Sequence, residues 1–290
     1  MVRMGFSVAL HYQVQAPGAD FIFNAQAAHT PQQRVFAEQL DISQPVLPQL
    51  YTDPVTRSRF VCLHAEPGPL RVAFGATVDI YHHLEAPQQI RESRIADMPG
   101  YVLPYLYPSR YCESDRLNTF AMQTFGSLPL GYARVLAIRD WVHRHVQFQS
   151  NSSTGTTSAC DTLASQQGVC RDFAHLMIAL CRAVNIPARF TTGFDYGADP
   201  ALGPPDFHAC VEVWLGHRWY LFDPSGTSIP MGFVRIGTAH DAADAAFATI
   251  FGMVVSEPPA VSIEAVPDDQ GLLVLPQHTL EALSTDAGTA

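Results

Sequence analysis

The first 110 residues alternate apolar and polar side chains in short runs, which is the pattern of strands with one buried face. The runs are FSVALHYQVQ, RFVCLHAE, LRVAFGATVDIYH and YVLPYLY, and Pro, Gly and Asp separate them as in turns. This pattern predicts a β-sandwich-like domain over residues 1–110. Within it, AAHTPQQRVFAEQL fits a short helix or an irregular insertion, and the sequence leaves both open.

After residue 110 the apolar spacing becomes helical, and GYARVLAIRDWVHRHVQF predicts an amphipathic helix. A Ser, Thr and Gly-rich loop, QSNSSTGTTSACDTL, follows and leads into a short helical patch that ends near Gly168. A strand is expected at SIEAV. We therefore predict an α+β domain over 111–265 and a flexible tail over 266–290.

The segment GVCRDFAHLMIALCRAVNIPARF predicts a second helix, which begins with Cys170 in its first turn. Gly168 is expected to let the chain turn sharply into this helix, and Pro187 marks its end. Unpaired N–H groups and the helix dipole favour the thiolate form of a cysteine at such an end. Cys181 lies within the apolar stripe of the same helix, so we expect it to be an inert core residue.

A partner for this thiol is expected on a hairpin formed by FHACVEVWLGHRWYLFDPSG. If Gly216 and His217 form a two-residue turn, paired residue numbers sum to 433 and Asp223 lies opposite Cys210. Asp223 is then a diagonal neighbour of His208 on the same face of the sheet.

The chemistry of these three side chains predicts a catalytic triad. His208 accepts the proton of Cys170 and later delivers it to a leaving amine, while Asp223 orients the imidazole. The backbone N–H of Cys170 is one expected oxyanion donor, and Ser158 or Trp141 is a candidate for the second. Asp172 and His175 lie on the same helix, where a first-turn charge and a packing role explain them.

Composition narrows the classes of partner. The formal net charge of −10 argues against nucleic acid and anionic membranes. The chain has no run of eighteen apolar residues, and its six cysteines form no CxxC pair, which favours reduced thiols and a cytoplasmic location. The sequence does not determine the oligomeric state.

Together these segments resemble the transglutaminase-like superfamily in its bacterial form. GVCRDFAHLMIALCRAVNIPAR is similar to the nucleophile helix of that family, FHACVEVWL to its histidine strand and WYLFDPSG to its aspartate strand. The segment HDAADAAFA is also similar to one in bacterial members. The resemblance implies a papain-like core, no metal or other cofactor, and Cys170, His208 and Asp223 as the catalytic residues. Where members often carry Ala-Trp after the histidine, this chain has Ala209 and Cys210.

The expected function is hydrolysis of an amide in a peptide or protein substrate, through a thioester on the cysteine. Transfer of the acyl group to an amine, as by a protein-glutamine acyltransferase, is the first alternative. A noncatalytic binding or scaffold module is the second, and the presence of all three triad residues counts against it. A zinc protein is a weaker option. The loop GFDYGADPALGPPDFH is expected to line the cleft.

Overall fold

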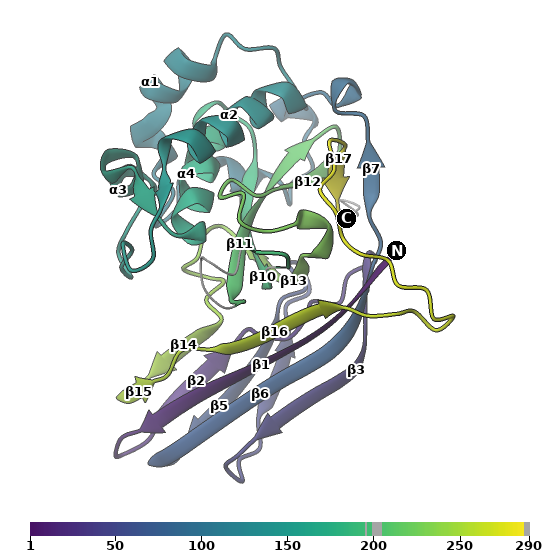
Figure 1. Cartoon of the computed structure of the whole chain (residues 1–290). Coiled ribbons are helices and arrows are strands. Elements are labelled where there is room, and N and C mark those ends of the chain that lie inside the picture. Colours follow the sequence, from purple (N-terminus) through teal and green to yellow (C-terminus); the bar gives the residue numbers. More distant parts are fainter. Residues whose placement is uncertain (195, 199–204, 287–290) are drawn as a thin grey trace.

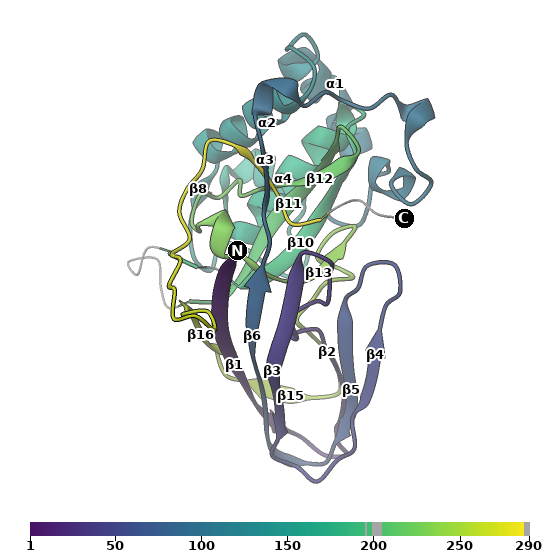
Figure 2. The same cartoon turned by 90° about the vertical axis from the view of Figure 1, so that its right-hand side faces the viewer.

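Two antiparallel sheets that bury one apolar core between them form the lower half of the molecule (Figures 1 and 2). The computed structural model describes residues 1–194, 196–198 and 205–286. The first sheet has the order β15-β1-β6-β3, with β16 also paired to β1, and comprises β1 (Val2–Val14), β3 (Gln33–Ile42), β6 (Gly68–Ile80), β15 (Val254–Ser256) and β16 (Ala260–Ala265). The second has the order β14-β2-β5-β4 and comprises β2 (Ala19–Phe23), β4 (Gln49–Thr52), β5 (Arg59–Ala65) and β14 (Ala248–Phe251). The predicted β-rich N-terminal region is confirmed, since every second residue of β1 is buried.

Two segments of this region differ from the sequence-based expectation. Residues 27–40, for which the sequence allows a helix or an insertion, contain most of β3, whose register shifts between Phe36 and Gln39, where Ala37 has a φ of 51°. This bulge disrupts the alternation that identifies a strand. The run YVLPYLY is a 3₁₀ helix over Leu103–Leu106 and not a strand, because Pro104 occupies its first turn and Tyr105 is buried against Trp219. Shorter 3₁₀ helices span Pro87–Gln89, Ile95–Asp97 and Pro230–Gly232.

Late segments of the chain return to the sandwich. β14 pairs with β2, and β15 and β16 pair with β1. The predicted end of the second domain at residue 265 therefore differs from the structure, in which 248–265 extend the N-terminal sheets. Pairing between strands more than 200 residues apart leaves no local signal in the sequence.

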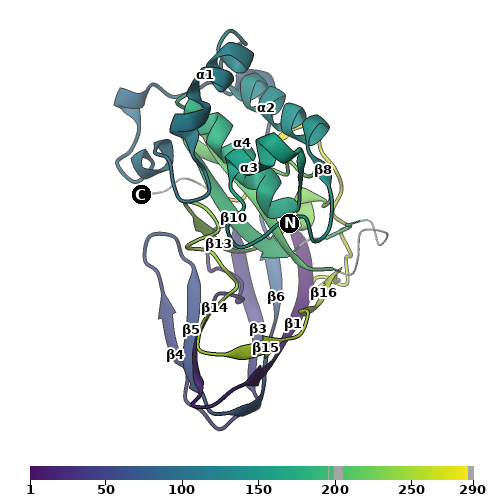
Figure 3. The same cartoon turned by 90° about the vertical axis from the view of Figure 1, so that its left-hand side faces the viewer.

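A four-stranded antiparallel sheet covered by helices forms the upper half (Figures 1 and 3). Its order is β12-β11-β10-β13, with β10 (Ala188–Phe194), β11 (Phe207–Leu215), β12 (Arg218–Phe222) and β13 (Val234–Ala239). The helices are α1 (Ser114–Phe125), α2 (Tyr132–His145), α3 (Ala159–Ser165) and α4 (Cys170–Ala183), and β8 (Gln147–Phe148) and β9 (Gln167–Gly168) form a short parallel pair beside them. Helix α4 is central, because it contacts the other three helices and also β10 and β11. This α+β core, a helix packed on an antiparallel sheet, is the predicted fold class.

The sandwich supports the core sheet directly. Phe194 of β10 and Val234 and Ile236 of β13 belong to the apolar core of the sandwich, and the Phe194 ring stacks on Phe6 with centroids 4.6 Å apart. The buried Gln33 side chain donates to the backbone oxygen of Arg235 and accepts from its N–H. The two predicted domains are therefore joined by shared packing and not by a flexible linker.

Part of the segment that we expected to be a flexible tail is ordered against the core. β17 (Ala282–Ser284) pairs with β7 (His83–Glu85), and Ala282 and Leu283 are buried because they fill apolar space beside β12. Residues 287–290 lie outside the described residues. Within the described chain, no helix is both long and apolar enough to span a membrane.

Candidate active site

Cys170 is the first residue of α4, as the sequence predicts, and the start of this helix is tightly held. The buried Asp172 carboxylate accepts hydrogen bonds from the Val169 N–H at 2.9 Å and from the Ser153 hydroxyl at 2.9 Å. Gly168 is required for space and not for a special turn, because a Cβ there would lie 2.7 Å from the Asp172 Cβ. Asp172 thus positions the helix start, and Cys170 is partly exposed at its tip.

The hairpin that carries His208 has the predicted register. Leu215 pairs with Arg218 and Val211 with Phe222, so paired numbers sum to 433. Gly216 and His217 form the tight turn with φ values of 52° and 75°. Positive φ at both central positions is what a two-residue turn of this hand requires.

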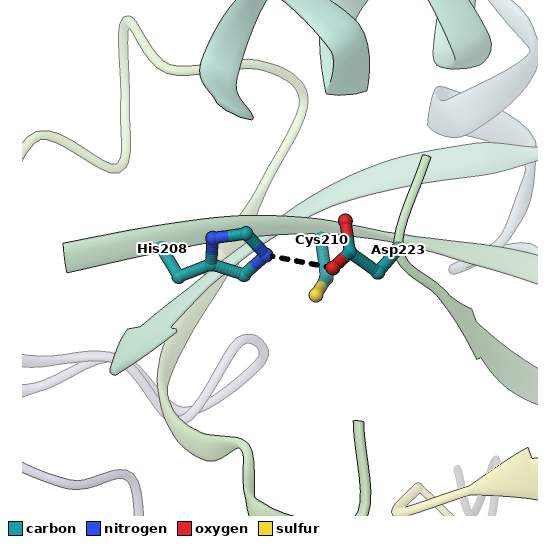
Figure 4. Close-up of side chains that lie close together, drawn as sticks. All are labelled: His208, Cys210 and Asp223. Atoms are coloured by element: carbon teal, nitrogen blue, oxygen red, sulfur yellow. Dashed lines mark ion pairs between the residues drawn. The ribbon is translucent and has the colours of Figure 1, made fainter. Parts of the chain in front are cut away.

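This register brings His208 and Asp223 together. His208 Nε2 lies 3.3 Å from Asp223 Oδ2, and both side chains are almost fully buried (Figure 4). At this distance the two side chains form a buried ion pair, and standard geometry gives Nε2 no further hydrogen-bond partner among the described residues. The contact is therefore one of charge.

The loop after β12 holds the Asp223 carboxylate. Oδ1 accepts from the N–H and hydroxyl of Ser225 at 2.9 and 2.6 Å and from the Gly226 N–H at 3.1 Å. Oδ2 accepts from the N–H and hydroxyl of Ser228 at 3.1 and 3.0 Å. Burial raises the pKa of Asp223, but the His208 charge and these hydrogen bonds outweigh it and hold the pKa well below its usual range. Sequence reasoning missed Ser225 and Ser228, although Asp-Pro-Ser-Gly is a turn in which an aspartate accepts from the following residues.

His208 also lies beside the nucleophile candidate. Burial lowers the pKa of His208, but the Asp223 charge, the Cys210 thiol and a hydrogen bond with Cys170 raise it well above its ordinary value. The protonated imidazole is thus favoured between a carboxylate and the Cys170 sulfur. The structure brings all three predicted residues, Cys170, His208 and Asp223, into one cluster.

Cys210 is a fourth member of this cluster. The register places it opposite Asp223, and its sulfur, a nitrogen of His208 and an oxygen of Asp223 lie within 4.8 Å of one another. Burial raises the pKa of Cys210 to about 12. These three residues are the one group of His, Cys, Asp or Glu among the described residues whose geometry could hold a metal ion.

Other candidates from the sequence have separate roles. Cys181 is fully buried in the helical core, as expected. His175 is buried, burial lowers its pKa to about 3, and its Nε2 accepts from the Ala242 N–H at 3.1 Å. Ser158 caps α3, since its hydroxyl accepts from the Asp161 N–H and the Asp161 carboxylate accepts from the Ser158 N–H. The Trp141 ring stacks on His145 with centroids 4.0 Å apart. The second oxyanion donor stays a prediction, and residues 195 and 199–204 of the expected cleft loop lie outside the described residues.

Comparison with known proteins places the chain in a family. A sequence model described as the transglutaminase-like superfamily matches residues 119–224, which include the whole cluster. A crystal structure of a candidate cysteine protease from Cytophaga hutchinsonii is 38% identical with a TM-score of 0.88, over 98% of this chain and 97% of that one.

Curated relatives match more locally. An uncharacterised protein of Mycobacterium leprae is 28% identical over 117 residues, and one of Mycobacterium tuberculosis is 28% identical over 114 residues. These matches cover 39% and 36% of this chain and span only 42% and 36% of those proteins. The fold, the family match and the near-complete alignment with the Cytophaga structure together show that the chain belongs to the transglutaminase-like superfamily.

Proposed function

We propose that the chain is a cysteine-nucleophile amide hydrolase that acts on a peptide or protein through a triad of Cys170, His208 and Asp223. The observation that carries the proposal is the position of His208, a buried histidine that contacts both a helix-terminal thiol and a carboxylate that accepts five hydrogen bonds. A nucleophile, a base and an orienting group in contact are the arrangement that acyl transfer to a side chain requires.

The acylation step uses the Cys170 thiolate as the nucleophile and the His208 imidazolium as the proton donor. The Cys170 thiolate attacks the carbonyl carbon of the amide, and the electron pair of the C=O bond moves to the oxygen. When this intermediate collapses, the C–N bond breaks and the amine leaves with the proton of the His208 imidazolium. The backbone N–H of Cys170 at the start of α4 is suited to hold the transient oxyanion, because the first N–H groups of a helix have no partner within it.

Deacylation reverses the roles with water. His208 removes a proton from the water that attacks the thioester carbonyl, and collapse releases the carboxylic acid and restores the thiolate. Asp223 keeps one ring nitrogen directed away from the sulfur and stabilises the imidazolium throughout. The fixed loop around Asp223 favours this role, since the carboxylate cannot rotate without breaking hydrogen bonds.

The same thioester would serve transfer to an amine, and the partition between water and amine separates the two activities. Hydrolysis is preferred because the 38% identical Cytophaga protein is described as a candidate cysteine protease. Incubation of a thioester or amide substrate with and without a primary amine gives the ratio. A predominance of the amine adduct would move the assignment to an acyltransferase.

The first experiment needs no substrate. Purified protein is treated with limiting iodoacetamide from pH 4 to 9, and the alkylated cysteine is located by peptide mass spectrometry in wild type and in His208→Ala. Cys170 is expected to react first and to lose its lead without His208, whereas buried Cys181 is the internal control that reacts slowly in both. Equal rates for all cysteines, or a different leading cysteine, would leave a noncatalytic scaffold as the better account.

A further inference from the structure

The His208, Cys210 and Asp223 cluster contains a buried thiol, Cys210, that the proposed reaction does not use. All three side chains point toward one another from β11 and the end of β12 (Figure 4). The buried Nε2 of His208 has no hydrogen-bond partner among the described residues, although it lies 3.3 Å from Asp223 Oδ2. This nitrogen is held by its ion pair with Asp223, so a metal ion bound there would replace a proton while keeping the carboxylate beside it.

The three donor atoms suit one class of ligand. Imidazole nitrogen, thiolate sulfur and carboxylate oxygen are the ligands of Zn²⁺, at about 2.0 to 2.3 Å each. Tetrahedral ligands at these lengths lie about 3.4 to 3.7 Å apart. The donor atoms here lie within 4.8 Å of one another, so a small rotation of the Cys210 or His208 side chain closes the site.

The surroundings also favour a metal ion. The serine and backbone hydrogen bonds hold the Asp223 carboxylate ionised, which is how outer-shell groups fix a ligand. A coordinating thiol is deprotonated by the ion itself, so burial of Cys210 as a neutral thiol is no barrier. A cavity of about 210 Å³ is lined in part by Asp223, Ser228 and Leu283, so it borders the site on the side of Asp223.

We propose that His208 Nε2, Cys210 Sγ and an Asp223 oxygen form an inhibitory site for Zn²⁺ or a similar soft divalent cation, with water in the fourth position. A bound ion occupies the ring nitrogen that faces Asp223 and replaces the proton that the imidazolium holds there. The other ring nitrogen keeps its N–H, but in a neutral metal-bound imidazole, which is a far weaker acid than the imidazolium and donates poorly to a leaving amine. The binding site stands on geometry alone, while its inhibitory effect rests on the proposed function.

The binding test uses the full chain after treatment with a chelator. Zn²⁺ affinity is measured by competition with a chromophoric chelator in wild type, Cys210→Ala, Cys170→Ala and Cys181→Ala. Wild type is expected to bind one equivalent. Loss of an outer-shell partner alone weakens metal binding by up to about 100-fold, so Cys210→Ala should weaken it by at least about that factor. Cys170→Ala and the matched buried-cysteine control Cys181→Ala should bind as wild type does.

A spectrum keeps the test decisive if Cys210→Ala does not fold. Co²⁺ is added to Cys170→Ala, in which a thiolate-to-cobalt charge-transfer band must come from another cysteine of the site. Presence of the band supports Cys210 as a ligand, and its absence overturns the proposal. Undiminished Zn²⁺ binding by folded Cys210→Ala also overturns it, and so does loss of binding in Cys170→Ala, which places the ion on the nucleophile.

The inhibitory effect is read from alkylation of Cys170. Zn²⁺ should slow the iodoacetamide reaction of Cys170 in wild type and leave it unchanged in Cys210→Ala, each compared with the same protein without metal. Slowing to the same extent in both proteins contradicts inhibition through Cys210. If Cys170 has no reactive lead even without metal, the proposed function fails, whereas the affinity and cobalt results still decide the metal site.

Discussion

Strand β11 carries two buried charged clusters on one face, and they are built differently. Four residues beyond His208, Glu212 is fully buried and accepts two hydrogen bonds from Arg189, at 2.8 and 2.6 Å, and two more from Arg235. Both carboxylate oxygens are occupied by guanidinium groups that stay charged at any ordinary pH. At His208 the contact with Asp223 is a single ion pair at 3.3 Å, and the ring also lies beside the Cys170 thiol.

This difference indicates a structural role for the Glu212 cluster and a catalytic role for the His208 cluster. The Glu212 cluster links β10, β11 and β13 through two arginines that stay protonated at any ordinary pH, so we assign it a structural role. The His208 cluster contains a group that can exchange a proton near neutral pH. Its neighbours, Asp223 and Cys170, orient the imidazole but leave its protons free to transfer. We therefore expect substitutions at the first cluster to cost stability and those at the second to cost activity.

The largest expected effect is on the nucleophile. Cys170→Ala removes the atom that forms the thioester, so activity should fall by more than about 1,000-fold. Stability should change little, because Cys170 is partly exposed at the tip of α4. Turnover of a peptide amide and urea denaturation measure the two quantities. Retained turnover would place the chemistry elsewhere and remove the basis of the comparison.

The next largest effect is on the orienting carboxylate. Asp223→Asn keeps the shape of the side chain but removes the charge that favours the imidazolium, so we expect activity to fall by about 100-fold to 10,000-fold. In the same variant, Cys170 should react with iodoacetamide less fast relative to the other cysteines than it does in wild type. A normal rate in folded Asp223→Asn would show that the contact with His208 is structural, like that of Glu212.

The position of this carboxylate was the part of the site most accessible from the sequence. Side chains alternate in a strand, so a two-residue turn at Gly216 and His217 fixed the partner of every residue in the hairpin. The same parity placed Cys210 opposite Asp223. The hydrogen bonds from Ser225 and Ser228 depend on the path of a loop that alternation does not describe, so the sequence did not reveal them.

Long-range pairing was the part of the fold least accessible from the sequence. The sequence predicts the strand β16 but places it in the wrong unit, because its partner β1 lies at the other end of the chain. The sequence of β17 predicts a flexible tail, whereas its pairing with β7 and its burial beside β12 depend on distant residues. Local patterns thus predict most elements and the neighbours within a hairpin, but not partners that lie far along the chain.

Substitution in the structural cluster should give the opposite result to Asp223→Asn. Glu212→Gln leaves two buried arginines without their full counter-charge, which should lower the free energy of unfolding by about 3 to 5 kcal/mol. Activity per folded molecule should be retained at low temperature. Urea denaturation followed by turnover of the folded fraction checks both. A large loss of turnover with normal stability would contradict the division between the clusters.

A smaller effect is expected at the second cysteine of α4. Cys181→Ala leaves a small gap in the helical core, so stability should fall by about 1 to 2 kcal/mol while activity is retained. This variant is the counterpart of Cys170→Ala on the same helix. Equal activity losses in the two variants would undermine the assignment of Cys170 as the nucleophile.

The smallest effect is a pH dependence that separates the two clusters. The pKa of His208 is raised in the folded state, whereas an unfolded histidine loses its proton near pH 6.5. Between pH 6.5 and 8 the native state therefore holds more protons than the unfolded state, and stability should fall by up to about 1.4 kcal/mol per pH unit. The contribution of His208 to the free energy of unfolding is thus fully present below pH 6.5 and decreases as the pH rises.

Asp223→Asn should flatten this slope in urea denaturation, because it removes the main charge that raises the pKa of His208. Glu212→Gln should keep the slope while lowering the whole curve, so equal slopes in wild type and Asp223→Asn would show that His208 does not hold its proton through Asp223.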